Sequence, residues 1–409
     1  MRVLVTSFPW EPHFNPIVPL GWAAVLAGHE VRVATTPTMT EVVGRSGLPV
    51  VSVGGDPSDA FREAGVEFTP PKGDQPDAAA QARWPEDWPA HPESLSDGQR
   101  DYFRKIGLFA SVIAAAQLPD LIALGESWRP DLIVHDGTQF AGPVLASALG
   151  VPNARYLLGY PGQLRVDTCY GPELVPEYRA LYEKFGVTPR QEPTVWLDPC
   201  PPSMQYPSLS GPSVLRMRYV PYNGTAELPA WLHEPPQRPR VYLTWGKTTG
   251  EWEGAAIGNF VRQAIEAAAG LDVELVAALS PTLLGLLTDL PEGVRTVTGL
   301  PMAAVLRTCT AVIHHAGPGT TLTAAAAGLP QLMITNHPHN AAIAAQVARI
   351  GAGRHLPIGE LPSDQAATSA EVAALLEKPA FAQDAARLRQ EIEDQPSPSS
   401  VVDRLAELC

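Results

Sequence analysis

Residues 312–321 read VIHHAGPGTT, a pattern in which a short apolar strand turns directly into the first turn of a helix. Gly317 and Gly319 shape a tight turn around Pro318, and the expected helix over residues 322–327 ends at Gly328. The first amides of a helix have no partner within it and carry the positive end of its dipole. The segment therefore predicts an anion site, to which a neighbouring histidine donates one more hydrogen bond.

Glycine-rich turns between strand and helix are common in α/β proteins, so an ordinary structural turn is the alternative interpretation. The paired His314 and His315 favour a phosphate site, because imidazoles at the end of an apolar strand are unusual as core residues. The turn lacks the third glycine of a dinucleotide fingerprint and the Lys-Ser/Thr ending of a P-loop. A dehydrogenase-like enzyme is disfavoured as well, because Phe8-Pro9-Trp10 follows the first expected strand in place of that fingerprint.

Composition limits the class of protein. A chain of 409 residues suggests two domains of about 200 residues each. The formal net charge of −14 argues against a nucleic-acid surface, which needs a basic stripe. The four cysteines have neither metal-ligand nor disulfide-framework spacing. Residues 1–7 form a strand pattern and not a signal peptide, and no apolar run approaches the length of a membrane span. We expect a cytoplasmic protein that binds neither nucleic acid nor membrane.

Two series of alternating strands and helices predict two doubly wound α/β domains. The expected strands cover residues 2–6, 30–34, 132–134, 153–157, 240–244, 273–277, 311–314 and 331–334. The expected helices cover residues 16–27, 140–149, 251–269, 301–307, 341–350 and 399–408, the last capped by Ser397. A proline-rich region over residues 199–239 separates the series. The predicted units are an N-terminal domain (1–215), a linker (216–238), a C-terminal domain (239–385) and C-terminal helices (386–409) that cross back to the first domain.

Two irregular segments, residues 56–96 and 158–171, interrupt the first domain. The former holds Phe61, Trp84 and Trp88 among polar residues and prolines. A long irregular loop in a compact domain is usually functional or mobile. The segment is therefore either a surface insertion or a lid whose aromatic side chains cover an apolar ligand.

A second anion loop is expected at residues 245–250, WGKTTG, which follow the strand over residues 240–244. Gly246 allows close approach, and Lys247 and Thr248 offer donors. Open α/β sheets bind ligands at the carboxyl ends of their strands, and two such sheets form a cleft. The two loops together are therefore expected to hold a diphosphate from both sides.

Several segments carry a family resemblance. They are GHEVRVA (28–34), PDLIVHD (130–136), VPYNG (220–224), LPM (300–302), HHAGPGTT (314–321), GLPQ (328–331), NA (340–341) and GAG (351–353). Over nearly its whole length the chain resembles the GT-B glycosyltransferases of family 1, especially the bacterial enzymes that attach deoxysugars to polyketide antibiotics. The resemblance implies the GT-B fold, in which two Rossmann-like domains face each other across a cleft.

The resemblance also implies roles for individual residues. The positions that match the family's diphosphate site are Gly246, Thr248, His315, Gly317, Gly319 and Thr320. Leu300 and Met302 match the place that holds the pyrimidine base. The donor would be a nucleoside-diphosphate sugar, most often a thymidine-linked (dTDP) deoxyhexose, and no cofactor is expected. His314, on the opposite side of its strand, is expected to be structural.

Sugar transfer needs a base that takes the proton of the acceptor hydroxyl. His13, in the loop after the first strand, matches the family's base, and imidazole suits the role because its pKa lies near working pH. Asp136 matches the aspartate that pairs with this histidine and fixes its tautomer. The alternatives are a solvated loop histidine and an N-cap for the helix near Phe140. His135 points the opposite way and is given no role.

The chain departs from the family where an Asp-Gln pair usually contacts sugar hydroxyls. Asn336 and His337 occupy these positions. An amide still bonds a hydroxyl but lacks the charge-assisted acceptor of a carboxylate. The departure suggests a sugar with fewer hydroxyls or an amino sugar.

The sequence thus predicts an inverting, metal-independent glycosyltransferase with an apolar polyketide-type acceptor, contacted by Phe14, Trp84 and Trp88. O-glycosylation is favoured, and a C-glycosyltransferase with Asp136 as base is the alternative. A non-catalytic nucleotide-sugar-binding partner is disfavoured because His13 and His315 are both present. Some related enzymes need an inactive homologue of a haem-thiolate monooxygenase as activator, and residues 34–41 are similar to that subgroup. A homodimer or an auxiliary activator protein therefore stays open.

Overall fold

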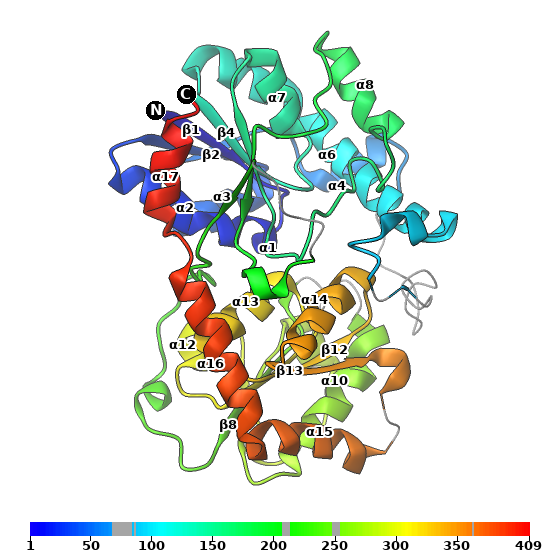
Figure 1. The fold of residues 1–409 in the computed structure, drawn as a ribbon, viewed down its shortest axis with the longest axis vertical. Coiled ribbons are helices and arrows are strands. Elements are labelled where there is room, and N and C mark those ends of the chain that lie inside the picture. Colours follow the sequence, from blue (N-terminus) through cyan, green and yellow to red (C-terminus); the bar gives the residue numbers. More distant parts are fainter. Residues whose placement is uncertain (68–83, 86, 207–212, 248–253, 362–363) are drawn as a thin grey trace.

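The computed structural model describes residues 1–67, 84–85, 87–206, 213–247, 254–361 and 364–409, with the backbone alone for residues 254–256. Two parallel sheets, one above the other in Figure 1, are each covered by helices on both faces. The chain termini lie close together on the N-terminal domain (Figure 1). This is an α/β architecture of two doubly wound domains.

The N-terminal sheet has the order β3-β2-β1-β4-β5-β6-β7, and all of its pairings are parallel. Its strands are β1 (Arg2–Thr6), β2 (Glu30–Thr35), β3 (Val50–Ser52), β4 (Leu132–Asp136), β5 (Asn153–Tyr156), β6 (Val195–Asp198) and β7 (Val214–Arg216). The strand order reverses between β1 and β4, where Thr6 lies opposite His135. Loops at such a switch point diverge and leave a crevice for a ligand.

Helices cover both faces of this sheet. They are α1 (Glu11–Phe14), α2 (Val18–Leu26), α3 (Thr40–Arg45), α4 (Pro57–Glu63), α6 (Asp97–Trp128), α7 (Ala141–Leu149) and α8 (Pro176–Lys184), with short 3₁₀ helices η1 (Asn15–Ile17), η2 (Pro37–Met39), η3 (Pro92–Ser94) and η4 (Pro202–Met204). One apolar core lies between the sheet and α4, α6, α7 and α8, and a second lies under α2 and α3. Strands buried on both faces explain the short continuous apolar runs in the sequence.

Helix α6 differs most from expectation. Ser96 and Gln99 form a capping box at its start, and the left-handed Arg129 ends it. By length and composition it is the one helix in the described part of the chain that is apolar enough to cross a membrane, so the expectation that no such run exists was wrong. The buried Phe103 and Leu118 belong to the N-terminal core, and α6 packs against α7 and α8.

The C-terminal sheet has the order β10-β9-β8-β11-β12-β13, and its pairings are parallel as well. Its strands are β8 (Arg240–Thr244), β9 (Glu274–Ala278), β10 (Arg295–Val297), β11 (Ala311–His314), β12 (Gln331–Thr335) and β13 (Gly353–Pro357). The order reverses between β8 and β11. Both expected anion loops therefore follow the two strands that flank this switch point.

The helices of this half are α10 (Gly254–Ala269), α11 (Pro281–Leu286), α12 (Met302–Leu306), α13 (Pro318–Ala327), α14 (Pro338–Arg349), α15 (Gln365–Glu377), α16 (Pro379–Asp394) and α17 (Pro398–Ala406), with η6 (Ala230–His233) and η7 (Ile358–Glu360). α16 packs against α13, and α17 packs against α2 of the other domain. The expected cap of the last helix is present, because the Ser397 side chain accepts a hydrogen bond from the amide of Ser400. Val401 and Leu405 complete the core under α2.

Several helices and strands begin or end at residues other than those predicted from the sequence. α13 begins at Pro318 and α14 at Pro338, each at a proline in the first turn, where the missing amide costs nothing. The proline-rich region over residues 199–239, expected to separate the two series, contributes the edge strand β7 of the N-terminal sheet. The segment expected to be irregular contains α4, whose Asp56 cap accepts from the amide of Ser58.

Candidate active site

Four strand ends bring the expected site residues to facing edges of the two sheets. β1 leads into α1 with His13, and β4 ends at Asp136. β8 leads to Gly246, and β11 ends just before His315. An ion pair between Glu11 and Lys247 joins the two edges directly. The candidate base and the candidate anion loops therefore face each other between the domains.

His13 and Asp136 form a hydrogen-bonded pair. Nδ1 of His13 lies 3.3 Å from Oδ1 of Asp136 and 3.1 Å from Oγ1 of Thr138. The Asp136 carboxylate also accepts hydrogen bonds from the amide of Phe8 at 2.6 Å, the amide of Thr138 at 2.7 Å and the Thr138 hydroxyl at 2.6 Å. It does not cap α7: the N-cap residue Phe140 provides no side-chain cap, and the amide of Ala141 donates to Oε1 of Gln139 at 3.0 Å. A proton on Nδ1 satisfies this arrangement and leaves Nε2 as the acceptor.

Electrostatics support that assignment. The Asp136 side chain is fully buried, while 17% of the His13 side chain is exposed. Burial alone would raise the pKa of Asp136, but His13, Thr138 and the Phe8 amide outweigh it and hold the pKa below its ordinary value. The rings of Phe8 and Trp10 pack around the imidazole, with centroids 5.3 and 5.9 Å away. His13 lies in a one-turn helix and not in an open loop, so its orientation is fixed.

Phe14 is a core residue, contrary to the expectation that it contacts the acceptor. Its side chain is fully buried under α2. Trp84 and Trp88 belong to the core on the opposite face of the sheet. Phe14 and His13 are neighbours in α1 whose side chains leave the helix in different directions, so sequence adjacency to the base did not place Phe14 beside the ligand.

His315 is enclosed between two glycines of the C-terminal domain. A Cβ added to Gly246 would lie 2.7 Å from Cε1 of His315, and one added to Gly317 would lie 2.6 Å from its Nε2. Gly246 also has a φ of 69°, which side-chain-bearing residues rarely adopt. Both positions therefore need glycine. They bring the backbone of the β8 loop and of the α13 turn onto the same imidazole.

One ring nitrogen of His315 has no hydrogen-bond partner among the described residues. This atom, Nδ1, is buried. Burial, with smaller effects from His314 and His337, lowers the pKa of His315 to about 3, so the ring is neutral at working pH. Ala316 follows with a φ of 62° and is fully buried. A buried donor beside a strained turn is a typical feature of a ligand site.

His314 is structural, in agreement with the sequence. Its Nδ1 accepts a hydrogen bond from the amide of Ala316 at 3.0 Å, and its Nε2 lies 2.9 Å from Oε1 of Gln331. Both ring nitrogens are therefore occupied. The ring ties the carboxyl end of β11 to β12 and leaves His315 as the histidine that faces the turn.

The first turn of α13 is open to an anion. Its N-cap, Gly317, provides no side-chain cap, and the hydroxyl of Thr321 bonds back to the Gly317 carbonyl at 3.0 Å. Gly319 and Thr320 stand in the first turn, where amides lack helical partners. Thr248, expected in the facing loop, lies outside the described residues.

Two linker residues reach the expected donor site, which sequence analysis missed. The Asn223 side chain accepts from the amide of Ala303 at 2.9 Å and donates to Thr323 at 3.3 Å. The Tyr219 hydroxyl donates to the Gly319 carbonyl at 3.1 Å. The linker thus ties the start of α12 to α13. Within the VPYNG segment only the side-chain amide of Asn223 could have signalled this cap.

The expected base site lies at the start of α12. Met302 is the first residue of this helix and is buried, and Leu300 packs partly buried against the same core. Trp231 of η6 packs on this cluster as well. The segment therefore presents an apolar surface and the main chain around Pro301 beside the expected diphosphate turn at the start of α13.

Two further histidines meet a tyrosine of the other domain. The Tyr102 hydroxyl on α6 lies 3.2 Å from Nδ1 of His337 and 3.3 Å from Nδ1 of His339. The two imidazole rings stack with centroids 5.3 Å apart. Asn336 is 9% exposed at the end of β12. The positions expected to contact the sugar therefore adjoin the domain boundary.

An apolar pocket opens at this boundary. It is lined by Trp88, Pro89, Tyr160, Pro161, Gly162, Gln163, Leu164, Tyr170, His339 and Ala342. Trp88 is 3% exposed and Trp84 packs on it, with ring centroids 5.6 Å apart. Only Trp88 of the three residues expected at the acceptor lines the pocket. Trp84 supports it from behind, and the aromatic residues are not a solvated insertion.

Within the described residues no three His, Cys, Asp or Glu side chains are grouped as a metal site. The four cysteines are all free.

Comparison with known proteins gives one consistent result. The N-terminal domain model of the erythromycin biosynthesis protein CIII-like family matches residues 22–246, and its C-terminal domain model matches residues 262–408. The aclacinomycin-T 2-deoxy-L-fucose transferase of Streptomyces galilaeus is 38% identical, over 100% of this chain and 96% of that protein. The 10-deoxymethynolide desosaminyltransferase of Streptomyces venezuelae is 36% identical, over 100% and 97%.

Solved structures agree. The glycosyltransferase VinC in complex with dTDP superimposes with a TM-score of 0.80 at 31% identity, covering 100% of this chain and 99% of that one. The spinosyn rhamnosyltransferase SpnG complexed with thymidine diphosphate gives a TM-score of 0.79 at 29% identity, covering 99% and 100%. The similarity therefore extends over both domains.

Proposed function

Because the chain belongs to the erythromycin biosynthesis protein CIII-like family of GT-B glycosyltransferases of antibiotic biosynthesis, we propose that it moves a deoxysugar from a dTDP-linked donor to a hydroxyl of an apolar polyketide. The observation that carries the proposal is the His13–Asp136 pair, which faces His315 and the turn of α13 across the domain boundary. In this proposal the base and the anion-binding turn act from opposite sides of one reacting centre. Such a geometry suits transfer with inversion.

His13 would take the proton of the acceptor hydroxyl. Asp136 and Thr138 hold Nδ1, so Nε2 is the free acceptor, and the buried carboxylate stabilises the imidazolium that forms. The attacking oxygen then bonds to the anomeric carbon as the bond to the diphosphate breaks. The buried Asp136 carboxylate is already taken up by hydrogen bonds from Phe8, Thr138 and His13, which disfavours Asp136 as the base of a C-glycosyltransferase and favours O-glycosylation with His13 as base.

The departing diphosphate would be stabilised by the C-terminal domain. The amides of Gly319 and Thr320 in the first turn of α13 point to an anion, and a neutral His315 donates one hydrogen bond. Lys247 is placed to exchange its partner Glu11 for a phosphate oxygen. We propose that these groups, without a metal ion, supply the charge compensation.

The pocket beside Asp136 is the proposed acceptor site. Its lining is aromatic and aliphatic apart from Gln163 and His339, as an apolar polyketide requires. Leu164 of its lining has its carbonyl 3.8 Å from where a Cβ on Gly137 would lie, so the pocket borders the residue that follows Asp136. On the donor side, Asn336 and His337 would face a sugar poor in hydroxyls.

The proposal is tested first by donor binding. Addition of dTDP at 100 times its Kd should stabilise the protein by about 2.7 kcal/mol, and UDP should stabilise it less. His315→Ala should lose most of the dTDP shift and retain its fold. Equal shifts with both nucleotides would refute the thymidine preference, and no shift with either would refute the donor site. NMR of the product then distinguishes O- from C-glycosylation and inversion from retention.

A further inference from the structure

The loop between β5 and α8 forms one wall of the apolar pocket. Tyr160, Leu164 and Tyr170 of this loop line it. The loop is irregular, and Cys169 and Tyr170 adopt left-handed backbone conformations with φ of 49° and 60°. Such conformations are unfavourable for residues with a side chain and persist only where other contacts hold them.

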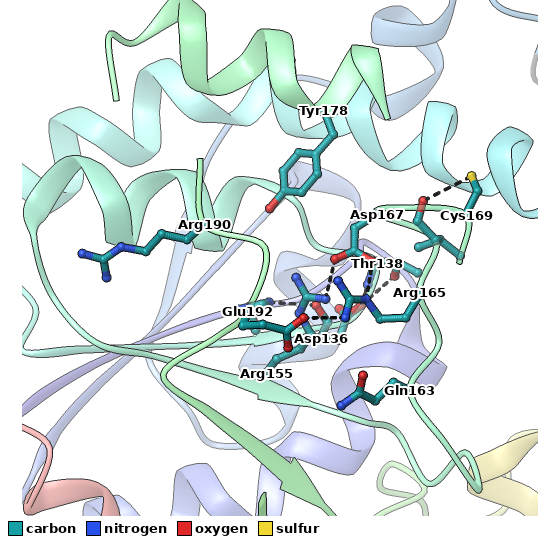
Figure 2. A network of polar contacts seen from close by, with 12 residues as sticks. Asp136, Thr138, Arg155, Gln163, Arg165, Asp167, Cys169, Tyr178, Arg190 and Glu192 are labelled. Atoms are coloured by element: carbon teal, nitrogen blue, oxygen red, sulfur yellow. Dashed lines mark hydrogen bonds and ion pairs between the residues drawn. The ribbon is translucent and has the colours of Figure 1, made fainter. Parts of the chain in front are cut away.

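A buried ion network holds the middle of this loop (Figure 2). Oδ2 of Asp167 accepts from Nη1 of Arg155 at 2.9 Å, and Oδ1 accepts from Nε of Arg165 at 3.0 Å. Asp167 is fully buried, and Arg165 also pairs with Glu192 at 2.6 Å. Burial alone would raise the pKa of Asp167, but the two arginines hold it below its ordinary value. The loop is thus fastened to β5 by a charged group that needs both partners.

Arg100, in the first turn of α6, joins this wall to the opposite one. Its Nη1 donates to the carbonyls of Cys169 at 3.3 Å and Tyr170 at 3.1 Å, so the left-handed pair turns both carbonyls toward one nitrogen. Its Nη2 donates to the carbonyl of Pro92 at 2.7 Å. Pro92 starts η3, just after the pocket residues Trp88 and Pro89. One guanidinium therefore sets the spacing of two pocket walls.

The same loop touches both halves of the reacting centre. The carbonyl of Leu164 would lie 3.8 Å from a Cβ added to Gly137, which follows Asp136. A Cβ on Gly159 would lie 2.3 Å from Cδ1 of Leu322 in α13. A shift of the wall would therefore change where a bound molecule lies relative to His13.

We propose that Arg100 and Asp167 are positioning residues for the acceptor, which fix the pocket wall so that an apolar acceptor presents its hydroxyl to His13. This inference rests on the proposed function, in which the pocket takes the acceptor. Neither side chain belongs to the proposed donor site or to the His13–Asp136 pair. Their loss should therefore act on acceptor use and leave donor use unchanged.

The test is steady-state kinetics of Arg100→Ala with each substrate varied in turn. The acceptor KM should rise about tenfold or more, because three charge-assisted hydrogen bonds to two walls are lost, while the donor KM stays within about twofold of wild type. Arg100→Lys should recover only part of the loss, because one ammonium does not span both walls. Arg104→Ala is the matched control: Arg104 lies one turn further along α6, is half exposed and pairs with Glu177.

Asp167→Asn keeps the shape of the side chain but removes the charge between two arginines. Because this change can also destabilise the fold, its acceptor KM is measured together with its thermal unfolding. The Arg100 variants carry the conclusion if this variant does not fold. Leu164→Ala alters the pocket surface itself. It therefore tests the acceptor pocket separately from the positioning role of Arg100. If Leu164→Ala raises the acceptor KM and Arg100→Ala does not, the positioning role is refuted and the acceptor pocket stands. If neither changes it, the pocket is not the acceptor site.

Discussion

Gly317→Ala tests whether His315 must act from a fixed place. Gly317 has φ −58° and ψ 140°, which alanine adopts freely, so the substitution strains no backbone. The new Cβ would lie 2.6 Å from Nε2 of His315, whereas ordinary contact begins at 3.4 Å. Gly246 bounds the ring at Cε1. Since two backbone segments confine the imidazole, it must move by roughly 0.8 Å, close to the 1 Å that costs catalysis about 10²-fold.

We therefore expect kcat of Gly317→Ala to fall by about 10²-fold and the free energy of unfolding to fall by about 1–3 kcal/mol from overpacking. Initial rates measured by liquid chromatography of the glycosylated product, with thermal unfolding in parallel, separate the two effects. Gly258→Ala is the control, because a Cβ in that turn of α10 meets nothing within 4 Å. It should leave kcat unchanged and stabilise the chain slightly. A kcat of Gly317→Ala within about twofold of wild type would refute the reasoning.

Three further predictions follow from the same geometry. His13→Ala should lower kcat by roughly 10²–10⁴-fold with little change in dTDP binding, measured by initial rates and thermal shift; an unchanged rate would remove His13 from the mechanism. Asp136→Asn should lower kcat and alter the pH profile of kcat/KM, because the buried carboxylate no longer stabilises the imidazolium; a wild-type profile would contradict the pairing. Stability should fall as pH drops below about 6.5, because burial lowers the pKa of His314 to about 4 and of His315 to about 3, and the unfolded chain then binds more protons. The slope should approach about 1.4 kcal/mol per pH unit for each histidine, and a flat denaturant midpoint between pH 6.5 and 4.5 would contradict it.

The parallel strands were the most predictable part of the fold. β1, β8 and β11 match their predicted bounds, because a strand buried on both faces is an uninterrupted apolar run between turns. α6 was not predicted, although it is the longest helix described. It is buried on one side and apolar over much of the rest, and it contains Pro119, so neither a clean helical period nor an unbroken pattern marks it.

Candidate site residues were predictable to different degrees for a physical reason. His13, Asp136 and His315 stand at strand ends, and strand order in a doubly wound sheet brings such ends together. The contact of Tyr102 with His337 joins residues of different domains and depends on how those domains dock. No local sequence pattern encodes how the two domains dock. The prediction that Phe14 contacts the acceptor was wrong because proximity in sequence to a site residue says nothing about the direction of a side chain.

The linker is the element whose role changes most. Sequence composition marks residues 216–238 as a passive connection, yet Tyr219 and Asn223 bond to α13, and Asn223 also caps the start of α12. The expected base site and the diphosphate turn are therefore fixed relative to each other by the segment that joins the domains. Met217 and Tyr222 of the same linker pack in the core of the N-terminal domain, so a rotation of one domain against the other would strain the linker between that core and these bonds. The proposed donor site at α12 and α13 and the orientation of the domains are therefore linked through this one segment.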